Sequence, residues 1–299
     1  MSWDRPLWRA SLAAALVLLG VALRSYRLGS WPMHGDEVSS LSEVHDFIAG
    51  QGASSNWVQA TSPLAHASLA LALKLAGESP LGVRLAPLVL GVLALVIAFP
   101  LVRGTFGSAI ATLFVAVIAF SPDHLFISSF GRYYSALFLC GLITTGGLAM
   151  MAARNARLGL LLVVLGLTVG TAFHLTAALL LPGCLLVLVL FAADRTDRRR
   201  STAARVLLLV LLAAIGVVFV TRYAALVHVY RNVIVNFPRA LGYRPAHLFL
   251  SLASNLGMGT CLFAIAGGVH AVLARSRTGL SILAGGAGDP EPASRHRCS

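Results

Sequence analysis

Long apolar segments follow one another through most of this chain, and their length is the feature that most constrains its fold. Several of them reach the roughly 20 residues that a helix needs to cross a bilayer. Charged residues make up only 11% of the 299 residues, whereas a soluble domain has about 25%. We therefore predict an all-α fold, a polytopic transmembrane helical bundle.

Eight segments are predicted to cross the membrane. They cover about residues 7–23, 84–102, 108–122, 133–153, 158–173, 175–193, 204–224 and 247–273. Residues 158–193 form one apolar stretch that would be about 54 Å long as a single helix, which exceeds a bilayer core of about 30 Å. We expect a tight hairpin near residues 170–174 to divide it. Residues 1–273 would form one transmembrane domain, and residues 274–299 a disordered cytoplasmic tail.

The long polar loop after the first span contains a short apolar segment at residues 63–76. Ser62 suits the N-cap position and Pro63 the first helical position, so a helix should begin here. Fourteen residues are too few to cross comfortably, which favours a helix lying at the membrane interface. The loop would then be external, and the basic cluster at 194–200 would be cytoplasmic, as the positive-inside rule prefers.

The basic excess of the chain gives a net charge of +12, which fits anionic lipid head groups or phosphate-bearing ligands. Outside the cluster at 194–200 the arginines lie mostly singly between apolar runs and form no basic face, so we expect no nucleic-acid partner. Three of the four cysteines lie inside apolar runs, a pattern that indicates neither a disulfide framework nor a metal knuckle.

Two adjacent carboxylates, Asp36 and Glu37, stand in the first external loop. Acidic side chains beside hydrocarbon are functional, or they cap a helix or signal topology. A carboxylate there could act as general base on an acceptor hydroxyl. The same predicted face carries Arg132 and Tyr134, and the hairpin brings His174 to it.

These motifs resemble a known family in their order and spacing. After Asp36-Glu37 come Pro63-Leu64, Arg84-Leu85-Ala86-Pro87, Ser121-Pro122, Arg132-x-Tyr134 and a His between two short spans. Over about residues 1–200 the chain is similar to the polyprenyl-phosphate-dependent glycosyltransferases of the GT-C class. Within that class it most resembles the bacterial relatives of protein O-mannosyltransferases and lipid A aminoarabinose transferases, in glycosyltransferase family 39.

The resemblance implies transfer of a sugar from a polyprenyl-phosphate donor to a hydroxyl of a glycan, lipid or protein acceptor. It implies that Asp36 is the catalytic carboxylate with Glu37 beside it, and that Arg132 and Tyr134 lie near the lipid phosphate. We add Ser62, His66 and His174 as expected substrate-binding residues. The enzyme would work by inverting single displacement at the external, periplasmic face of the inner membrane. The family's usual His-Pro-Pro-Leu is Thr61-Ser62-Pro63-Leu64 here, and Gly131 replaces its usual acidic residue.

Other interpretations of the same residues remain open. Asp36 and Glu37 could cap an interfacial helix beginning near Val38, and Arg132 could be an interface anchor. The sequence indicates no definite cofactor, but a divalent metal is one alternative, since three histidines, His34, His66 and His174, could bind it with Glu37. The chain could instead be a transporter or lipid flippase, although its spans carry little charge and show no internal repeat. It could also be a short or truncated, inactive member of the family.

Overall fold

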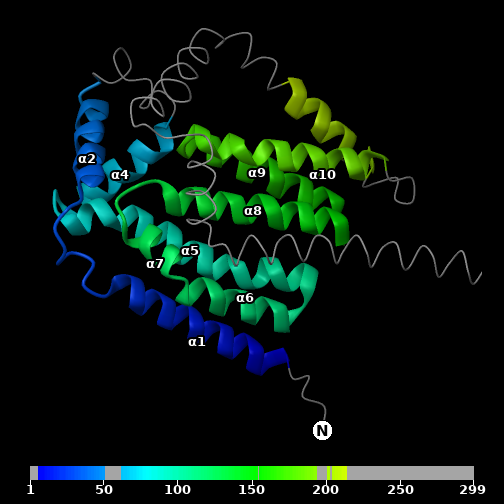
Figure 1. Cartoon of the computed structure of the whole chain (residues 1–299), viewed down its shortest axis with the longest axis horizontal. Coiled ribbons are helices and arrows are strands. Elements are labelled where there is room, and N and C mark those ends of the chain that lie inside the picture. The colour runs from blue at the N-terminus through cyan, green and yellow to red at the C-terminus, as the bar shows by residue number, and fades with distance from the viewer. Residues whose placement is uncertain (1–5, 51–61, 154, 194–200, 203, 214–299) are drawn as a thin grey trace, which may run out of the picture. The chain divides into compact units, whose positions relative to one another are not determined.

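The computed structural model describes residues 6–50, 62–153, 155–193, 201–202 and 204–213. Within these ranges the regular structure is helical (Figure 1). The helices are α1 (Pro6–Ser25), α2 (Gly35–Ile48), α4 (Pro63–Ala76), α5 (Pro80–Phe106), α6 (Ser108–Phe120), α7 (Pro122–Ser129), α8 (Tyr134–Ala153), α9 (Ala156–Phe173), the 3₁₀ helix η1 (Leu175–Leu180) and α10 (Leu181–Ala193). A further short apolar helix covers Ala204–Ala213. The predicted all-α class is thus confirmed for the described part of the chain.

Four of the described helices, α1, α5, α8 and α9, are long and apolar enough to cross a membrane. A fifth span results if α6 and α7 are counted together, although their axes bend by 60° where they meet. The predicted span over 108–122 corresponds to α6, and Ser121, which follows the end of α6, is the N-cap of α7. The predicted span at 247–273, the tail at 274–299 and most of 204–224 lie outside the described residues.

The bend between α6 and α7 is filled by a buried arginine from α1. Arg24 is 1% exposed, and its guanidinium donates to the carbonyl oxygens of Ile118 (3.0 Å) and Ala119 (3.2 Å) at the end of α6. It also contacts His124 and Ser128 on α7. The last carbonyls of a helix have no partner within it, and in hydrocarbon no water can replace that partner. Arg24 therefore supplies hydrogen bonds that the bend would otherwise lack.

The apolar stretch 158–193 breaks at His174, inside the predicted hairpin. His174 is extended (φ −166°, ψ 141°) between α9 and η1. Beyond it, Cys184 and Leu188 of α10 pack in one core cluster with Met151 of α8 and Val163 of α9, so the chain turns back along the helices it has just formed. The predicted division of this stretch is therefore observed.

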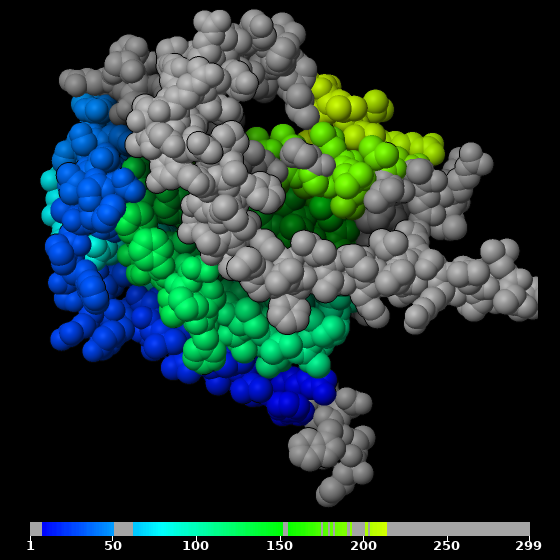
Figure 2. All heavy atoms as spheres, viewed as in Figure 1, coloured from blue at the N-terminus to red at the C-terminus, as the bar shows by residue number. Residues whose placement is uncertain are grey.

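Helices α2 and α4 lie at one end of the bundle. Figure 1 shows α2 standing across the ends of the longer helices, and in the space-filling view it forms the surface on that side (Figure 2). Val44 of α2 packs with Leu69 and Leu73 of α4 and Val83 of α5 in a separate small core cluster. This cluster fixes α2 against α4, and so it determines which polar side chains of the two helices meet.

Helix α4 covers the predicted residues 63–76, with Ser62 at the N-cap and Pro63 in the first turn. The hydroxyl of Ser62 makes no capping hydrogen bond, however, and it is buried without any partner in the described structure. Ser62 thus occupies the predicted N-cap position, but its side chain does not form the capping hydrogen bond. That α4 lies at the membrane interface remains a prediction.

Candidate functional site

The site begins with the start of α2. The side chain of His34 accepts a hydrogen bond from the backbone N–H of Asp36 (3.2 Å), and the carboxylate of Glu37 accepts from the backbone N–H of His34 (2.9 Å). This reciprocal capping box satisfies N–H groups that have no partner inside the helix. It starts the helix at Gly35, and of the two adjacent carboxylates it is Glu37 that takes the capping role.

Glu37 is fully buried and holds a two-point ion pair with Arg84 of α5. The guanidinium nitrogens Nε and Nη2 of Arg84 lie 2.8 and 2.7 Å from the two carboxylate oxygens. The backbone N–H of Gly131 donates a further hydrogen bond at 2.7 Å. Burial alone would raise the pKa of Glu37, but the hydrogen bonds from Arg84, His34 and Gly131 outweigh it, and the pKa lies below its ordinary value. Glu37 is therefore a charged, saturated carboxylate with no free face.

Arg84 also holds the loop that leads to α2. Its terminal nitrogens donate to the backbone carbonyls of Leu28 (2.9 Å), Trp31 (3.1 Å) and Pro32 (2.9 Å). Sequence reasoning used Arg84 only as part of a motif and gave it no role. A single arginine near the start of a leucine-rich helix was the available signal, because such a charge needs an acidic partner.

Asp36, in contrast, is open to solvent. Its side chain is 54% exposed, and Oδ1 lies 3.8 Å from Nη2 of Arg132, in the loop between α7 and α8. The two residues are 96 positions apart in the sequence, and they come from the two segments that sequence analysis assigned to the same face. An accessible carboxylate can accept a proton from a ligand, and the cation close to it can bind a negatively charged group of that ligand.

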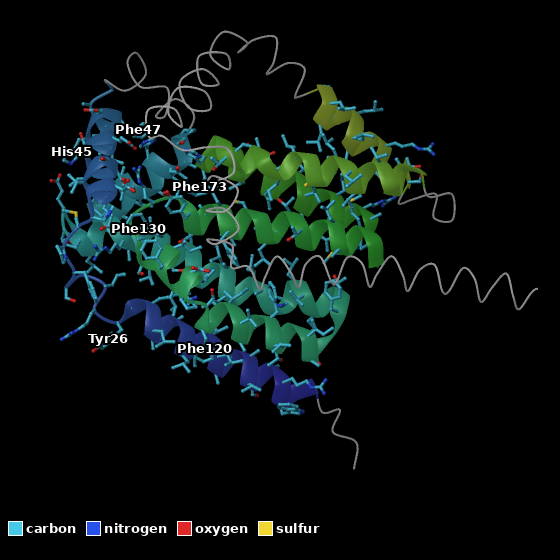
Figure 3. All side chains as sticks on the ribbon, in the orientation of Figure 1. Tyr26, His45, Phe47, Phe120, Phe130 and Phe173 are labelled. Atoms are coloured by element: carbon cyan, nitrogen blue, oxygen red, sulfur yellow. The ribbon has the colours of Figure 1, made fainter. Side chains whose placement is uncertain are left out.

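A groove of about 830 Å³ opens beside Asp36. One wall carries aromatic residues spaced four apart, Phe126, Phe130 and Tyr134, whose neighbouring ring centroids lie 5.0 and 6.3 Å apart. Trp31 lines it as well, and Figure 3 shows Phe130 at the same end of the bundle as α2. The groove thus joins an apolar surface to the exposed carboxylate.

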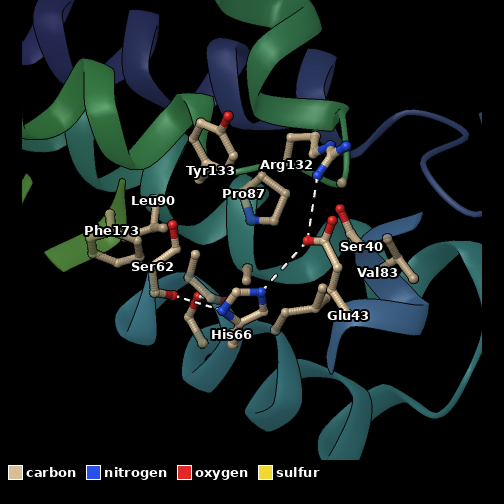
Figure 4. A pocket seen from close by; sticks show the side chains of 15 residues that line it. Ser40, Glu43, Ser62, His66, Val83, Pro87, Leu90, Arg132, Tyr133 and Phe173 are labelled. Atoms are coloured by element: carbon tan, nitrogen blue, oxygen red, sulfur yellow. Dashed lines mark hydrogen bonds and ion pairs between the residues drawn. The ribbon is translucent and has the colours of Figure 1, made fainter. Parts of the chain in front are cut away.

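On the other side of Arg132 lies a smaller cavity of about 40 Å³ (Figure 4). Nη1 of Arg132 is 3.7 Å from Oε2 of Glu43, and the same oxygen is 3.6 Å from Nε2 of His66 on α4. Ser62 and Tyr133 also line this cavity. Sequence reasoning missed Glu43, although it follows Asp36 by seven residues, or about two helical turns, and so lies on the same face of α2.

His174 reaches the site through Tyr133. Their rings stack with centroids 3.9 Å apart and planes 7° apart, and the His174 side chain accepts from the backbone N–H of Thr176 as the cap of η1. Burial, and then the nearby Arg132, lower the pKa of His174 below its ordinary value. Burial raises the pKa of Tyr133 to about 12, so its phenol keeps its proton at neutral pH.

The predicted site residues are therefore divided among several places. Arg132 stands between the groove, which contains Asp36 and Tyr134, and the cavity, which contains Ser62 and His66. Glu37 belongs to the buried pair with Arg84. Among the described residues, no group of three or more His, Cys, Asp or Glu side chains is arranged to hold a metal ion.

Gly131 shows why this chain departs from the acidic residue usual at that position. A Cβ atom at Gly131 would overlap the side chain of Val83 and come within 3.1 Å of the Glu37 carboxylate. An acidic side chain would therefore meet both a steric clash and a like charge. Glycine allows the backbone to approach Glu37 and donate to it.

Comparison with known proteins identifies the family. The family model for dolichyl-phosphate-mannose-protein mannosyltransferases matches residues 60–234, which is more than half of the chain and includes Arg84, His66 and Arg132. Comparisons with curated proteins and with solved structures gave no match. With its apolar helices and the family match taken together, the chain is an integral membrane protein that belongs to the dolichyl-phosphate-mannose-protein mannosyltransferase family of GT-C-type glycosyltransferases.

Proposed function

We propose that the protein transfers a sugar from a polyprenyl-phosphate-linked donor to an acceptor hydroxyl, with Asp36 as general base. The observation that carries this proposal is the pairing of an exposed carboxylate, Asp36, which lines the groove, with Arg132 at 3.8 Å. Family membership supports the reaction class. The same step serves a hydroxyl of a glycan, a lipid or a protein, since each presents the same O–H group.

In the proposed step, the acceptor oxygen attacks the anomeric carbon of the sugar and Asp36 takes the hydroxyl proton. The bond from the anomeric carbon to the phosphate oxygen breaks, and the polyprenyl phosphate leaves with the electron pair. Phosphate is a good leaving group that needs no protonation, so one carboxylate is enough, whereas glycoside hydrolysis requires two. A single displacement of this kind inverts the anomeric centre.

Arg132 is the proposed partner of the departing phosphate. A planar guanidinium can contact two phosphate oxygens at once, and the negative charge on those oxygens grows as the bond breaks. Its contacts with Asp36 and Glu43, at 3.8 and 3.7 Å, are longer than a tight ion pair, which leaves its N–H groups available to an anion. Tyr134, exposed in the groove, would lie beside the same phosphate.

Glu37 has a different role in this proposal. Its oxygens are all engaged, so it acts through position: it starts α2, ties α2 to α5 and accepts from the residue just before Arg132. Asp36 thus precedes the buried Glu37 in the chain, and Arg132 follows Gly131, which is hydrogen-bonded to Glu37. We place the reaction on the external face of the inner membrane, with α4 at the interface, as the charge distribution favours.

The test is a donor-consumption assay in membranes, with a panel of radiolabelled polyprenyl-phosphate sugars. We expect Asp36→Asn to lower turnover by about 10²–10⁴-fold, since it removes the base and keeps the shape. Asp46→Asn is the matched control, because Asp46 is an exposed aspartate on the same helix. Wild-type turnover by Asp36→Asn, with normal protein levels, would refute the assignment.

A further inference from the structure

Ser62, the residue before α4, does not do what a serine at its position usually does. A serine at the N-cap of a helix normally accepts a hydrogen bond from a backbone N–H of the first turn. The Ser62 side chain makes no such bond, and its hydroxyl oxygen is buried without a hydrogen-bond partner in the described part of the chain. The residue is 1% exposed, so the surrounding solvent does not satisfy the hydroxyl either. Leaving a buried hydroxyl unpaired is unfavourable, and folded proteins keep few such groups.

The backbone of Ser62 is held in place by His66, one turn further along α4. The carbonyl oxygen of Ser62 accepts from the backbone N–H of His66 (3.2 Å) and lies 2.8 Å from the ring atom Nδ1. The ring is 4% exposed and stacks on Phe47, with centroids 5.5 Å apart. The Ser62 hydroxyl is therefore carried by a fixed backbone, and only rotation of the side chain remains for it to meet a partner.

Ser62 borders the cavity that also contains Arg132 (Figure 4). Two further serines, Ser40 and Ser68, line this cavity, but their hydroxyls donate to carbonyl oxygens of their own helices at 3.0 and 2.9 Å. Among the three serines, Ser62 is thus the one whose hydroxyl has no partner in the described structure. The volume of about 40 Å³ holds about three water molecules or one hydroxyl-bearing carbon, and it is too small for a sugar ring.

The position of Arg132 indicates which ligand reaches this cavity. In the proposed reaction the donor phosphate binds Arg132, and the sugar is bonded directly to that phosphate. The hydroxyl groups of the sugar then lie next to the residues that share the cavity with Arg132. Tyr133, Pro87 and Leu90 also line it. An apolar wall with a few polar groups is typical of a site that recognises a small ligand.

We propose that this cavity binds one hydroxyl group of the donor sugar and that Ser62 recognises that group by a hydrogen bond. A serine hydroxyl both donates and accepts, so it can pair with a sugar hydroxyl in either role. This inference rests on the proposed function, because it takes the ligand of Arg132 to be a sugar phosphate. The motif usual in the family has proline where this chain has Ser62. Proline offers no side-chain hydrogen bond, so the contact belongs to the sugar preference of this chain.

The test compares a donor with its deoxygenated analogues. The probes are short-chain polyprenyl phosphates of the sugar that gives the highest turnover in the donor panel, and the analogues that each lack one hydroxyl of that sugar. For the wild type, kcat/KM of one analogue should be about tenfold lower than that of the complete donor, the size expected for one neutral hydrogen bond. In Ser62→Ala, kcat/KM of the complete donor should fall by the same factor, and that of this analogue should not fall further.

Thermal stability separates recognition of the sugar from a structural role of Ser62. Ser62→Ala removes no side-chain hydrogen bond of the described structure, so it should unfold at the temperature of the wild type or above it. Ser68→Ala is the matched control, because it removes a hydroxyl beside the same cavity that is already bonded to its own helix. The ratio of kcat/KM between the complete donor and each analogue should be the same in Ser68→Ala as in the wild type.

Three results would overturn this inference. The wild type could use every analogue as well as the complete donor, Ser62→Ala could discriminate among them as the wild type does, or Ser68→Ala could lose discrimination to the same extent as Ser62→Ala. Failure of the proposed function would look different. The wild type would then consume none of the polyprenyl-phosphate donors in the panel, and both proposals would fall together.

Discussion

Asp36 and Glu37 are adjacent carboxylates in very different surroundings. Glu37 is fully buried, with its two oxygens held by Arg84 and by backbone N–H groups. Asp36 is 54% exposed and meets its arginine only at 3.8 Å. Successive residues of a helix point about 100° apart, so one faces α5 and the other faces the groove. The same chemical group thus serves structure at one position and is available for chemistry at the next.

The difference also separates the two arginines. Arg84 makes short, two-point contacts with Glu37 and contacts three carbonyls of the preceding loop, so it is committed to the fold. The guanidinium of Arg132 lies 3.8 Å from the Asp36 carboxylate and 3.7 Å from that of Glu43, and it makes a short contact with neither. A ligand can therefore compete for Arg132 without disturbing the fold, but it cannot compete for Arg84.

The largest effect should come from Glu37→Gln, which leaves the buried charge of Arg84 without a counter-ion. Breaking one partner of a buried ion pair costs about 3–5 kcal/mol, so we expect a large fall in thermal stability in detergent. Asp36→Asn, an exposed change, should alter stability by at most about 0.5 kcal/mol. A Glu37→Gln protein that is as stable as the wild type but inactive would assign Glu37 to the chemistry and end the contrast.

The second-largest effect should come from Arg132→Lys. Lysine keeps the charge but loses the planar fork, so we expect donor turnover to fall by about 100-fold with membrane insertion unchanged. Arg103→Lys, at the exposed far end of α5, is the control and should have no effect on turnover. An interface anchor would tolerate lysine, which reaches the head groups equally well. Unchanged turnover in Arg132→Lys would therefore identify Arg132 as an anchor.

Gly131→Ala tests the approach of the loop to Glu37. The added methyl group would overlap Val83 and crowd the Glu37 carboxylate, which should destabilise the protein by about 1–3 kcal/mol. Gly35→Ala is the control, because a Cβ atom there meets nothing within 4 Å. Helix propensity should make that change neutral or slightly stabilising. Equal thermal stabilities of the two variants would show that the contact with Gly131 contributes little.

The smallest expected effect is on the thermal stability of the protein at acidic pH. The pKa of Glu37 lies below its ordinary value of 4.5, so its ion pair stabilises the fold above that pH and the stabilisation is lost as the pH falls through the lowered pKa. The thermal unfolding temperature of the wild type should decline below about pH 4.5 more steeply than that of Glu37→Gln. Parallel declines of the two proteins would indicate that other groups dominate acid unfolding.

Local sequence signals predicted where helices begin and end better than they predicted which distant side chains contact each other. The bounds of α4 followed from Ser62-Pro63 at one end and Gly77 at the other, and the break at His174 followed from the length of an apolar stretch. The bend at Ser121-Pro122 was not predicted, although its signal was present in the sequence. A serine followed by a proline is typical of a helix start, and α7 begins there.

The partners of Glu37 and Glu43 could not be predicted from the sequence. Arg84 is 47 residues from Glu37, and periodicity says which face a residue occupies but not which side chain meets it there. Sequence reasoning therefore placed Asp36 and Arg132 on one face without their distance, and it named Asp36 as the catalytic carboxylate without showing that Glu37 beside it is buried. Their different roles depend on burial, which the contacts of α2 with α4 and α5 decide.

The guanidinium of Arg24 has a consequence for biogenesis. Because it supplies the hydrogen bonds for the carbonyls of Ile118 and Ala119, the bend between α6 and α7 depends on a residue made some 94 positions earlier in synthesis. Helix α1 is synthesised before α6, so Arg24 can complete the bend only if α1 lies beside α6 when the bend forms. Formation of the α6–α7 bend, which leads to the loop carrying Arg132, is thus coupled to the packing of α1.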